Sequence, residues 1–137
     1  MSVVVPHRAI QKVSLSSDPK KAIFDVVGDL SGVHLMADMV LIGTYIRPEK
    51  TAGGIIRPDS NVQEDVWQGK AGLVLKLGPT AFQDTADYSF SGDTVKVGEW
   101  CVYKVGDAWS LNIKNYPCRL IRDVGIRLKL DDPSLVF

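Results

Sequence analysis

Short apolar stretches of alternating polarity, separated by turn-forming residues, constrain the fold of this 137-residue chain more than any other feature. These stretches cover residues 36–46, 71–77, 99–105, 109–114, 118–121 and 124–130. Between them stand turn signals such as Gly78-Pro79, Gly106-Asp107 and Lys114-Asn115. Short strands with regular turns and little helical pattern are typical of an all-β domain. We predict a small β-barrel with a filled interior and a wet exterior.

The pattern within each stretch predicts which faces are buried. Residues 36–46 are apolar at both parities, so this strand should be buried on both faces. Two later strands alternate and should each turn one apolar face inward, formed by Leu73, Leu75 and Leu77 in the first and by Trp109, Leu111 and Ile113 in the second.

Residues 1–33 lack the strand pattern of the rest of the chain. We therefore predict that they form an N-terminal extension to a β domain of residues 34–137. Ser17 or Asp18 can cap a short helix that has Pro19 in its first turn and ends at Gly28. Its apolar stripe consists of Ile23, Val26, Val27 and Leu30. The stripe can pack on its own domain or on a neighbouring subunit, and the sequence leaves both open.

Two long segments have neither strand nor helix periodicity. Residues 49–69 carry Gly53-Gly54 followed by two isoleucines, Ile55 and Ile56. Loops of this length are usually functional or disordered. Exposed isoleucines at the loop tip suggest a binding partner, although they can also fold back on their own domain. The second segment, residues 80–93, is polar with spaced aromatic residues and predicts a projecting hairpin or flap that carries Phe82, Tyr88 and Phe90.

Composition argues against several function classes. Sixteen basic residues balance sixteen acidic ones, so no excess charge favours nucleic acid or an anionic membrane. No apolar run approaches the roughly 18 residues of a membrane helix, and the N-terminus does not read as a signal peptide. Cys101 and Cys118 lie in predicted strands, so we expect both to be buried free thiols in a reducing compartment.

Catalytic and metal-binding signals are equally weak. The two histidines, His7 and His34, are far apart and have no neighbouring ligands for a metal. None of the nucleophile-elbow, dinucleotide, P-loop or zinc-protease motifs occurs. We therefore expect a protein that is not an enzyme and that needs no cofactor or metal.

The order of features resembles the GroES-like co-chaperonin family, and more closely the GroES-like proteins of tailed bacteriophages. The family opens with a Leu-x-Asp-x-Val-x-Val strand, which residues 36–42 match. A loop with Ala-Gly-Gly-Ile follows, as in residues 52–56, and then a strand like residues 69–78. Residues 95–99 match the Val-Lys-Val-Gly-Asp segment that comes after the next excursion, and the whole match spans roughly residues 34–130.

This resemblance implies a homo-oligomeric ring, usually of seven barrels, that caps a host or phage chaperonin through mobile loops. Ile55 and Ile56 match the first two residues of the family's apolar docking tripeptide, and residues 80–93 match its roof hairpin. The implied role is to assist the folding of proteins, including capsid proteins, in the host cytoplasm.

Two departures from the family pattern keep a second reading open. The third docking position is Arg57, where the family usually has an apolar residue, and the extension of about 33 residues is absent from ordinary co-chaperonins. The alternative is a virion protein, either a capsid decoration or cement protein or a neck component. It would clamp the major capsid protein through Ile55, Ile56 and the extension.

Overall fold

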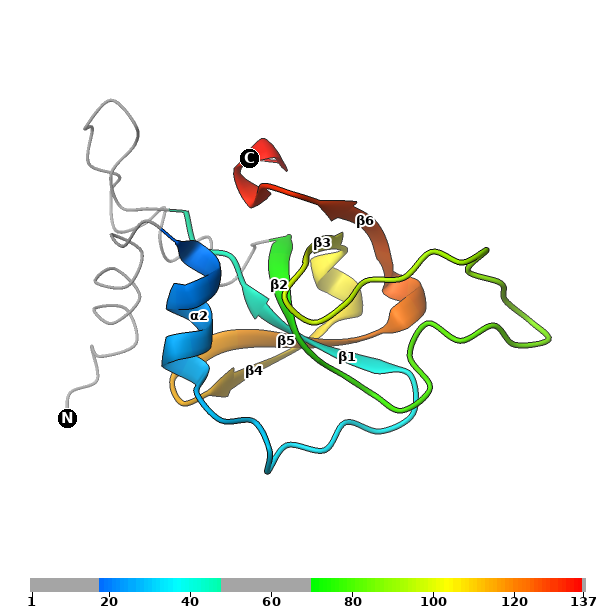
Figure 1. Cartoon of the computed structure of the whole chain (residues 1–137), viewed down its shortest axis with the longest axis horizontal. Coiled ribbons are helices and arrows are strands. Elements are labelled where there is room, and N and C mark those ends of the chain that lie inside the picture. Colours follow the sequence, from blue (N-terminus) through cyan, green and yellow to red (C-terminus); the bar gives the residue numbers. More distant parts are fainter. Residues whose placement is uncertain (1–17, 48–69, 137) are drawn as a thin grey trace.

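A computed structural model describes residues 18–47 and 70–136, which form one antiparallel six-stranded sheet in the order β4-β5-β1-β2-β3-β6 (Figure 1). The strands are β1 (Met39–Thr44), β2 (Ala71–Leu77), β3 (Trp100–Tyr103), β4 (Trp109–Ile113), β5 (Tyr116–Arg122) and β6 (Ile126–Leu130). The helix α2 (Pro19–Val27) precedes the sheet, and three short 3-10 turns are η1 (Val105–Asp107), η2 (Asp123–Gly125) and η3 (Pro133–Val136). The predicted all-β fold is confirmed.

The sheet curls strongly, as its connections require. β5 and β6 are separated by three strands in the sheet order, yet the three residues of η2 join them. Ile121 and Ile126, at the two ends of this connection, belong to the same buried cluster. A connection this short brings the end of β5 close to the start of β6, which a flat sheet would not allow.

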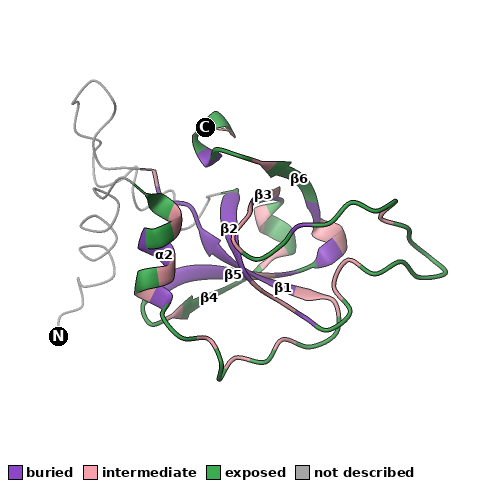
Figure 2. Cartoon of the chain, viewed as in Figure 1, coloured by how far each residue is buried: buried purple, intermediate pink, exposed green. Residues whose placement is uncertain are grey.

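Both faces of the central strands are apolar, so the wet exterior predicted for the sheet is wrong there. The flap-side cluster consists of Val40, Ile42, Val74, Val95, Cys101, Tyr103, Ile121 and Ile126. The helix-side cluster consists of Ile23, Val27, Leu41, Tyr45, Ile46, Ala71, Leu73, Leu75, Trp100, Tyr116 and Cys118. Strand β1 contributes to both clusters and is buried on both faces, as its unbroken apolar pattern predicted (Figure 2).

Helix α2 has the ends that its sequence predicts. The Asp18 carboxylate accepts a hydrogen bond from the Lys20 backbone N–H at 3.0 Å, and Pro19 occupies the first turn. Gly28 ends the helix with a positive φ of 64° and donates its N–H to the Phe24 carbonyl. Ile23 and Val27 are buried in the helix-side cluster, so the stripe packs on its own sheet.

The helix approaches β1 closely at Gly43. A Cβ at this position would lie 2.9 Å from Cγ2 of Ile23, so the missing side chain lets helix and strand meet. In the described ranges, no helix is long and apolar enough to cross a membrane.

A β-bulge in β2 corrects one prediction about its faces. Leu41 pairs with Lys76 and Ile42 with Val74, so Leu75 is the extra residue of the bulge. Leu73 and Leu75 lie in the helix-side cluster as expected, but Leu77 packs against the flap-side cluster. Lys76 takes the helix side instead, where its Nζ donates to the carbonyl oxygens of Leu30 and Val33.

Strand β4 does not bury the face predicted for it. Trp109 is 73% exposed and Leu111 36% exposed, while Ile113 packs against the helix-side cluster. β4 is an edge strand with β5 as its neighbour, and the C-terminal end of α2 lies beside Lys114 at the turn. The helix therefore covers the Ile113 end of the strand and leaves the Trp109 end open.

Candidate functional site

The loop predicted to bind a partner connects strands β1 and β2. Its predicted binding residues, Gly53, Gly54, Ile55, Ile56 and Arg57, lie outside the described residues. The strands that flank the loop are adjacent and antiparallel, so both of its stems leave the same end of the sheet. The stems are held at this end, because Tyr45 N–H donates to the Ala71 carbonyl at 2.9 Å and Tyr103 N–H donates to the Lys70 carbonyl at 3.0 Å.

The stem that leaves β1 is anchored in the core. Tyr45 and Ile46 are each 5% exposed, and the Tyr45 ring packs edge-on against Trp100 with 5.5 Å between ring centroids. The buried Tyr116 hydroxyl donates a hydrogen bond of 2.5 Å to the carbonyl oxygen of Thr44, at the end of β1. The β1 stem of the loop therefore starts from a packed and hydrogen-bonded base.

The second predicted element, the flap, leaves the opposite end of β2. β2 begins at Ala71 beside the loop stems and ends at Leu77, where the flap starts, and Figure 1 shows the flap projecting from the far end of the sheet. A strand of this length spans roughly 20 Å. The flap consists of turns and irregular backbone without paired strands, so it is a flap and not a hairpin with its own ladder.

The three predicted flap aromatics come together in one row. The rings of Phe82 and Phe90 pack edge-on with centroids 5.4 Å apart, and Tyr88 packs against Phe90 at 4.7 Å. Phe82 also packs against the flap-side cluster, whereas Tyr88 is 40% exposed. The row therefore runs from the core to the surface and gives the flap its own small apolar centre.

Side chains of Asp and Thr fold the tip of the flap. The Asp84 carboxylate accepts from the Phe90 N–H at 2.8 Å, and the Thr85 hydroxyl accepts from the Asp87 and Tyr88 N–H groups at 3.2 Å each. Thr85 N–H in turn donates to the Tyr88 carbonyl at 2.8 Å. Such local side-chain-to-backbone bonds replace a ladder in a segment that lacks strand periodicity.

The base of the flap is fixed by Asp123, a residue that the sequence did not single out. Its side chain is 3% exposed and accepts a hydrogen bond from the Phe82 N–H at 2.9 Å. Its own N–H donates to the Asp38 carbonyl at 3.0 Å. Phe82 has a positive φ of 61°, an unusual backbone conformation for an aromatic residue, and the Asp123 bond helps to hold it.

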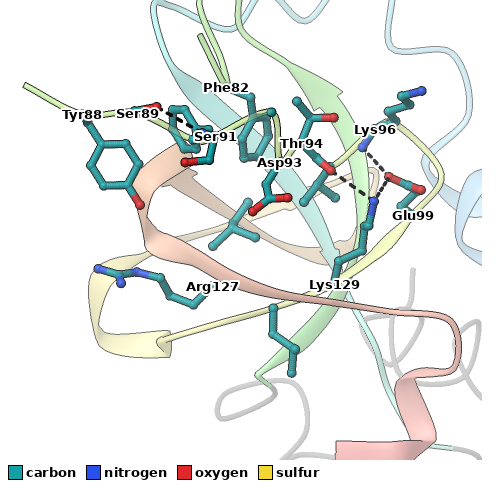
Figure 3. Close-up of a pocket in the computed structure, with 15 residues that line it drawn as sticks. Phe82, Tyr88, Ser89, Ser91, Asp93, Thr94, Lys96, Glu99, Arg127 and Lys129 are labelled. Carbon is teal, nitrogen blue, oxygen red and sulfur yellow. Dashed lines mark hydrogen bonds and ion pairs between the residues drawn. The ribbon is translucent and has the colours of Figure 1, made fainter. Parts of the chain in front are cut away.

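A cavity of about 640 Å³ lies between the flap and β6 (Figure 3). Its walls combine the flap aromatics with polar and charged side chains of Asp93, Lys96, Glu99, Arg127 and Lys129. Lys129 Nζ lies 3.7 Å from the Glu99 carboxylate and donates to the Thr94 carbonyl at 3.2 Å, which joins β6 to the flap. The cavity thus lies beneath the flap, and its lining contains both acidic and basic side chains.

One carboxylate in the cavity, that of Glu99, has a pKa that its neighbours shift. The Lys96 backbone N–H donates to the Glu99 carboxylate at 2.8 Å, and this bond, helped by the Lys129 and Lys96 charges, lowers the pKa of Glu99. Within the described ranges, no group of three or more His, Cys, Asp or Glu side chains is placed to hold a metal ion.

Sequence reasoning also missed Arg119, the largest of the fully buried side chains in the described residues. It is 1% exposed, and its Nη1 donates to the Cys118 carbonyl at 3.3 Å. Its charge opposes the effect of burial on Tyr103, whose pKa burial raises to about 12. Arginine side chains are mostly exposed in proteins, so the local sequence did not indicate that this one is buried opposite Ile42 of β1.

The comparison with protein families agrees with this geometry. The family model described as the chaperonin 10 kDa subunit matches residues 33–129, well over half of the chain. No curated protein matches the chain. Chaperonin 10 subunits are in general non-enzymatic and form oligomeric rings that partner with chaperonins. The match begins after α2 and includes both loop stems, the flap and almost all of β6. The chain belongs to the chaperonin 10 family of co-chaperonins.

Proposed function

We propose that this chain is the subunit of a co-chaperonin ring that docks residues 53–57 into a chaperonin and turns its flap toward the opposite end of the ring. One observation carries the proposal: β2 begins at the loop stems and ends at the flap. A rigid strand thus separates the docking arm from the flap by roughly 20 Å. A ring that caps a chaperonin needs a docking loop at the end that faces the chaperonin and a closing element at the other end.

The energetics of the loop favour a multivalent partner. Burying Ile55 and Ile56 in an apolar groove supplies roughly 1.5–3 kcal/mol for each side chain. Ordering each loop residue costs about 1–2 kcal/mol of backbone entropy, so ordering only a few residues offsets that gain. One loop therefore binds weakly, whereas several loops on one ring bind well because the first contact raises the effective concentration of the rest.

The finer parts of the proposal follow the resemblance to the co-chaperonins of tailed bacteriophages. They are a seven-membered ring, a host or phage chaperonin as partner, and capsid proteins as folding clients in the host cytoplasm. The replacement of the third apolar docking residue by Arg57 supports a partner groove that differs from the ordinary one. A carboxylate at the rim of that groove would satisfy the guanidinium.

The capsid-clamping alternative makes a different demand on the N-terminal extension. A tether to a neighbouring capsid subunit must leave its own domain, whereas Ile23 and Val27 of α2 are buried in the helix-side cluster of their own sheet. A clamp would therefore have to use residues 1–17, because α2 is packed on its own domain.

Mixing the purified protein with chaperonin and nucleotide tests the proposal. We expect a stable complex that forms with nucleotide and elutes together in size-exclusion chromatography. If no complex forms and the protein instead co-purifies with assembled virus particles, the co-chaperonin proposal is wrong and the capsid alternative replaces it.

A further inference from the structure

Among the described residues, the outer edge of β4 is unpaired and carries exposed apolar side chains. Trp109 is 73% exposed and Leu111 36% exposed. Both lie on the helix-side face, because their partners on β5, Leu120 and Cys118, pair in turn with Leu41 and Gly43 of β1. Leu120 is half-buried and lies opposite Trp109. We call Trp109, Leu111 and Leu120 the β4 strip.

The backbone of β4 offers hydrogen-bonding groups beside this strip. The two-residue turn Lys114-Asn115, with φ values of 49° and 67°, makes Ile113 and Tyr116 the first hydrogen-bonded pair of the hairpin. The N–H and C=O groups of Ile113, Leu111 and Trp109 therefore point to β5. Those of Ser110 and Asn112 point to the open edge, where another strand can pair with them.

The two edges of the sheet differ in how they are protected. Edge strands usually carry charges, proline or bulges that block pairing with another chain. β6, at one edge, carries Arg127 and Lys129. β4, at the other, has the sequence Trp-Ser-Leu-Asn-Ile, without charge or proline, and pairs with β5 in an unbroken register. The β4 edge thus lacks the charges, proline and bulges that block the addition of a strand.

We propose that the β4 strip binds an extended apolar segment of a non-native polypeptide by strand addition. This inference rests on the proposed function, because it assigns a client-binding surface to a co-chaperonin subunit. Backbone pairing with Ser110 and Asn112 gives affinity for any extended chain. Trp109 and Leu111 select segments with apolar residues at every second position, since alternate side chains of the added strand lie on their face.

The small size of the strip favours a transient client over a permanent neighbour. The exposed parts of Trp109 and Leu111 together offer on the order of 200 Å² of apolar surface. A stable protein–protein interface buries about 800 Å² on each partner. A second copy of this chain needs a larger contact than the strip supplies, whereas a client that must be released needs only a weak one.

Binding of a fluorescein-labelled peptide of about seven residues with alternating valine and threonine tests the inference by fluorescence anisotropy. We expect Trp109→Ser to weaken binding about tenfold, because it removes most of the exposed apolar area of the strip. The matched control is Leu135→Ser, which removes an apolar side chain of equal 73% exposure from η3 and should leave binding unchanged. Thermal unfolding of each variant checks that the fold is retained.

A second pair of probes tests strand addition itself. N-methylation of the peptide at alternate residues removes the N–H groups that an added strand uses, and we expect it to weaken binding at least tenfold. On the protein side, Asn112→Pro removes an N–H at the open edge without touching a bond to β5. It should have the same effect as N-methylation of the peptide.

Three results would overturn the inference. They are equal binding by the wild type and Trp109→Ser, equal binding of the methylated and unmethylated peptides, or dissociation of the oligomer of Trp109→Ser in sedimentation velocity. The last would make the strip a contact between copies. Chaperonin binding of the same variant, measured separately, should be unchanged. Peptide binding without any chaperonin complex of the wild type would refute the proposed function and not the binding by the strip.

Discussion

The two cysteines are buried on opposite faces of the sheet. Cys101 belongs to the flap-side cluster and Cys118 to the helix-side cluster, and neither thiol is exposed. Burial raises the pKa of each thiol from 9.0 to about 12. Both thiols therefore act as small apolar residues in the folded protein and ionise readily only when it unfolds.

Stability should consequently fall in alkaline solution. Between pH 9 and about 12 the unfolded chain loses its thiol protons while the folded chain keeps them, so the unfolded state binds fewer protons. The free energy of unfolding should drop by about 1.4 kcal/mol per pH unit for each thiol in this window. Urea unfolding at pH 8 and at pH 10.5 measures the drop. Cys118→Ala should reduce it, and an equal stability at both pH values would contradict the burial.

At the base of the flap, Asp123 should matter more than the exposed Asp84. Asp123→Ala leaves the Phe82 N–H without its acceptor in a partly buried position, and we expect a loss of about 1–3 kcal/mol in the free energy of unfolding. Asp123→Asn keeps an acceptor oxygen and should restore most of the stability. Asp84→Ala, the matched change at the exposed flap tip, should cost less. Equal chemical denaturation midpoints for all three variants would show that Asp123 does not anchor the flap.

Close contact between strands makes Gly72 the most sensitive glycine of the sheet. A Cβ at Gly72 would lie 2.2 Å from Cγ2 of Ile42 and 2.8 Å from the Gly43 carbonyl oxygen, and the backbone of β1 cannot retreat easily. Gly72→Ala should destabilise the protein by about 1–3 kcal/mol or more. Gly32→Ala meets no atom within 4 Å and serves as the control. Thermal unfolding compares them, and equal melting temperatures would contradict the packing.

At the scale of single elements, local chemistry could be predicted and neighbour-dependent features could not. The ends of α2 and the Lys114-Asn115 turn depend on a few adjacent residues, and the structure confirms them. Burial of β1 on both faces follows from its unbroken apolar run and is also confirmed. These features require no knowledge of what lies across the sheet.

The wrong predictions all depend on neighbours. The alternation in β4 correctly places Trp109, Leu111 and Ile113 on one face. Only the strand order shows that β4 is an edge strand, and only the packing shows that α2 covers just one end of it. The bulge at Leu75 arises from the pairing with β1 and moves Leu77 to the other face. Asp123 likewise gains its role from a flap that is distant in sequence.

At the scale of the whole molecule, the order of features along the chain was the most informative signal. The strand, the Ala-Gly-Gly-Ile loop, the second strand and the flap predicted the co-chaperonin family, and the family match over residues 33–129 confirms it. The structure adds the spatial relation that sequence could not supply. Loop stems and flap lie at opposite ends of β2, an arrangement that is consistent with the proposed docking arm and flap.

The proposed function depends on Ile55 and Ile56 docking the ring onto a chaperonin, and a binding experiment tests this dependence. Chaperonin binding in the presence of nucleotide is compared between the wild type and the double variant Ile55→Asp, Ile56→Asp. Leu135→Asp, a charge at an equally apolar but unrelated exposed site, is the control. We predict that the double variant loses at least a hundredfold in apparent affinity, because multivalent binding multiplies the loss over all loops, while the control binds as the wild type does. Unchanged binding of the double variant would show that Ile55 and Ile56 do not anchor the ring.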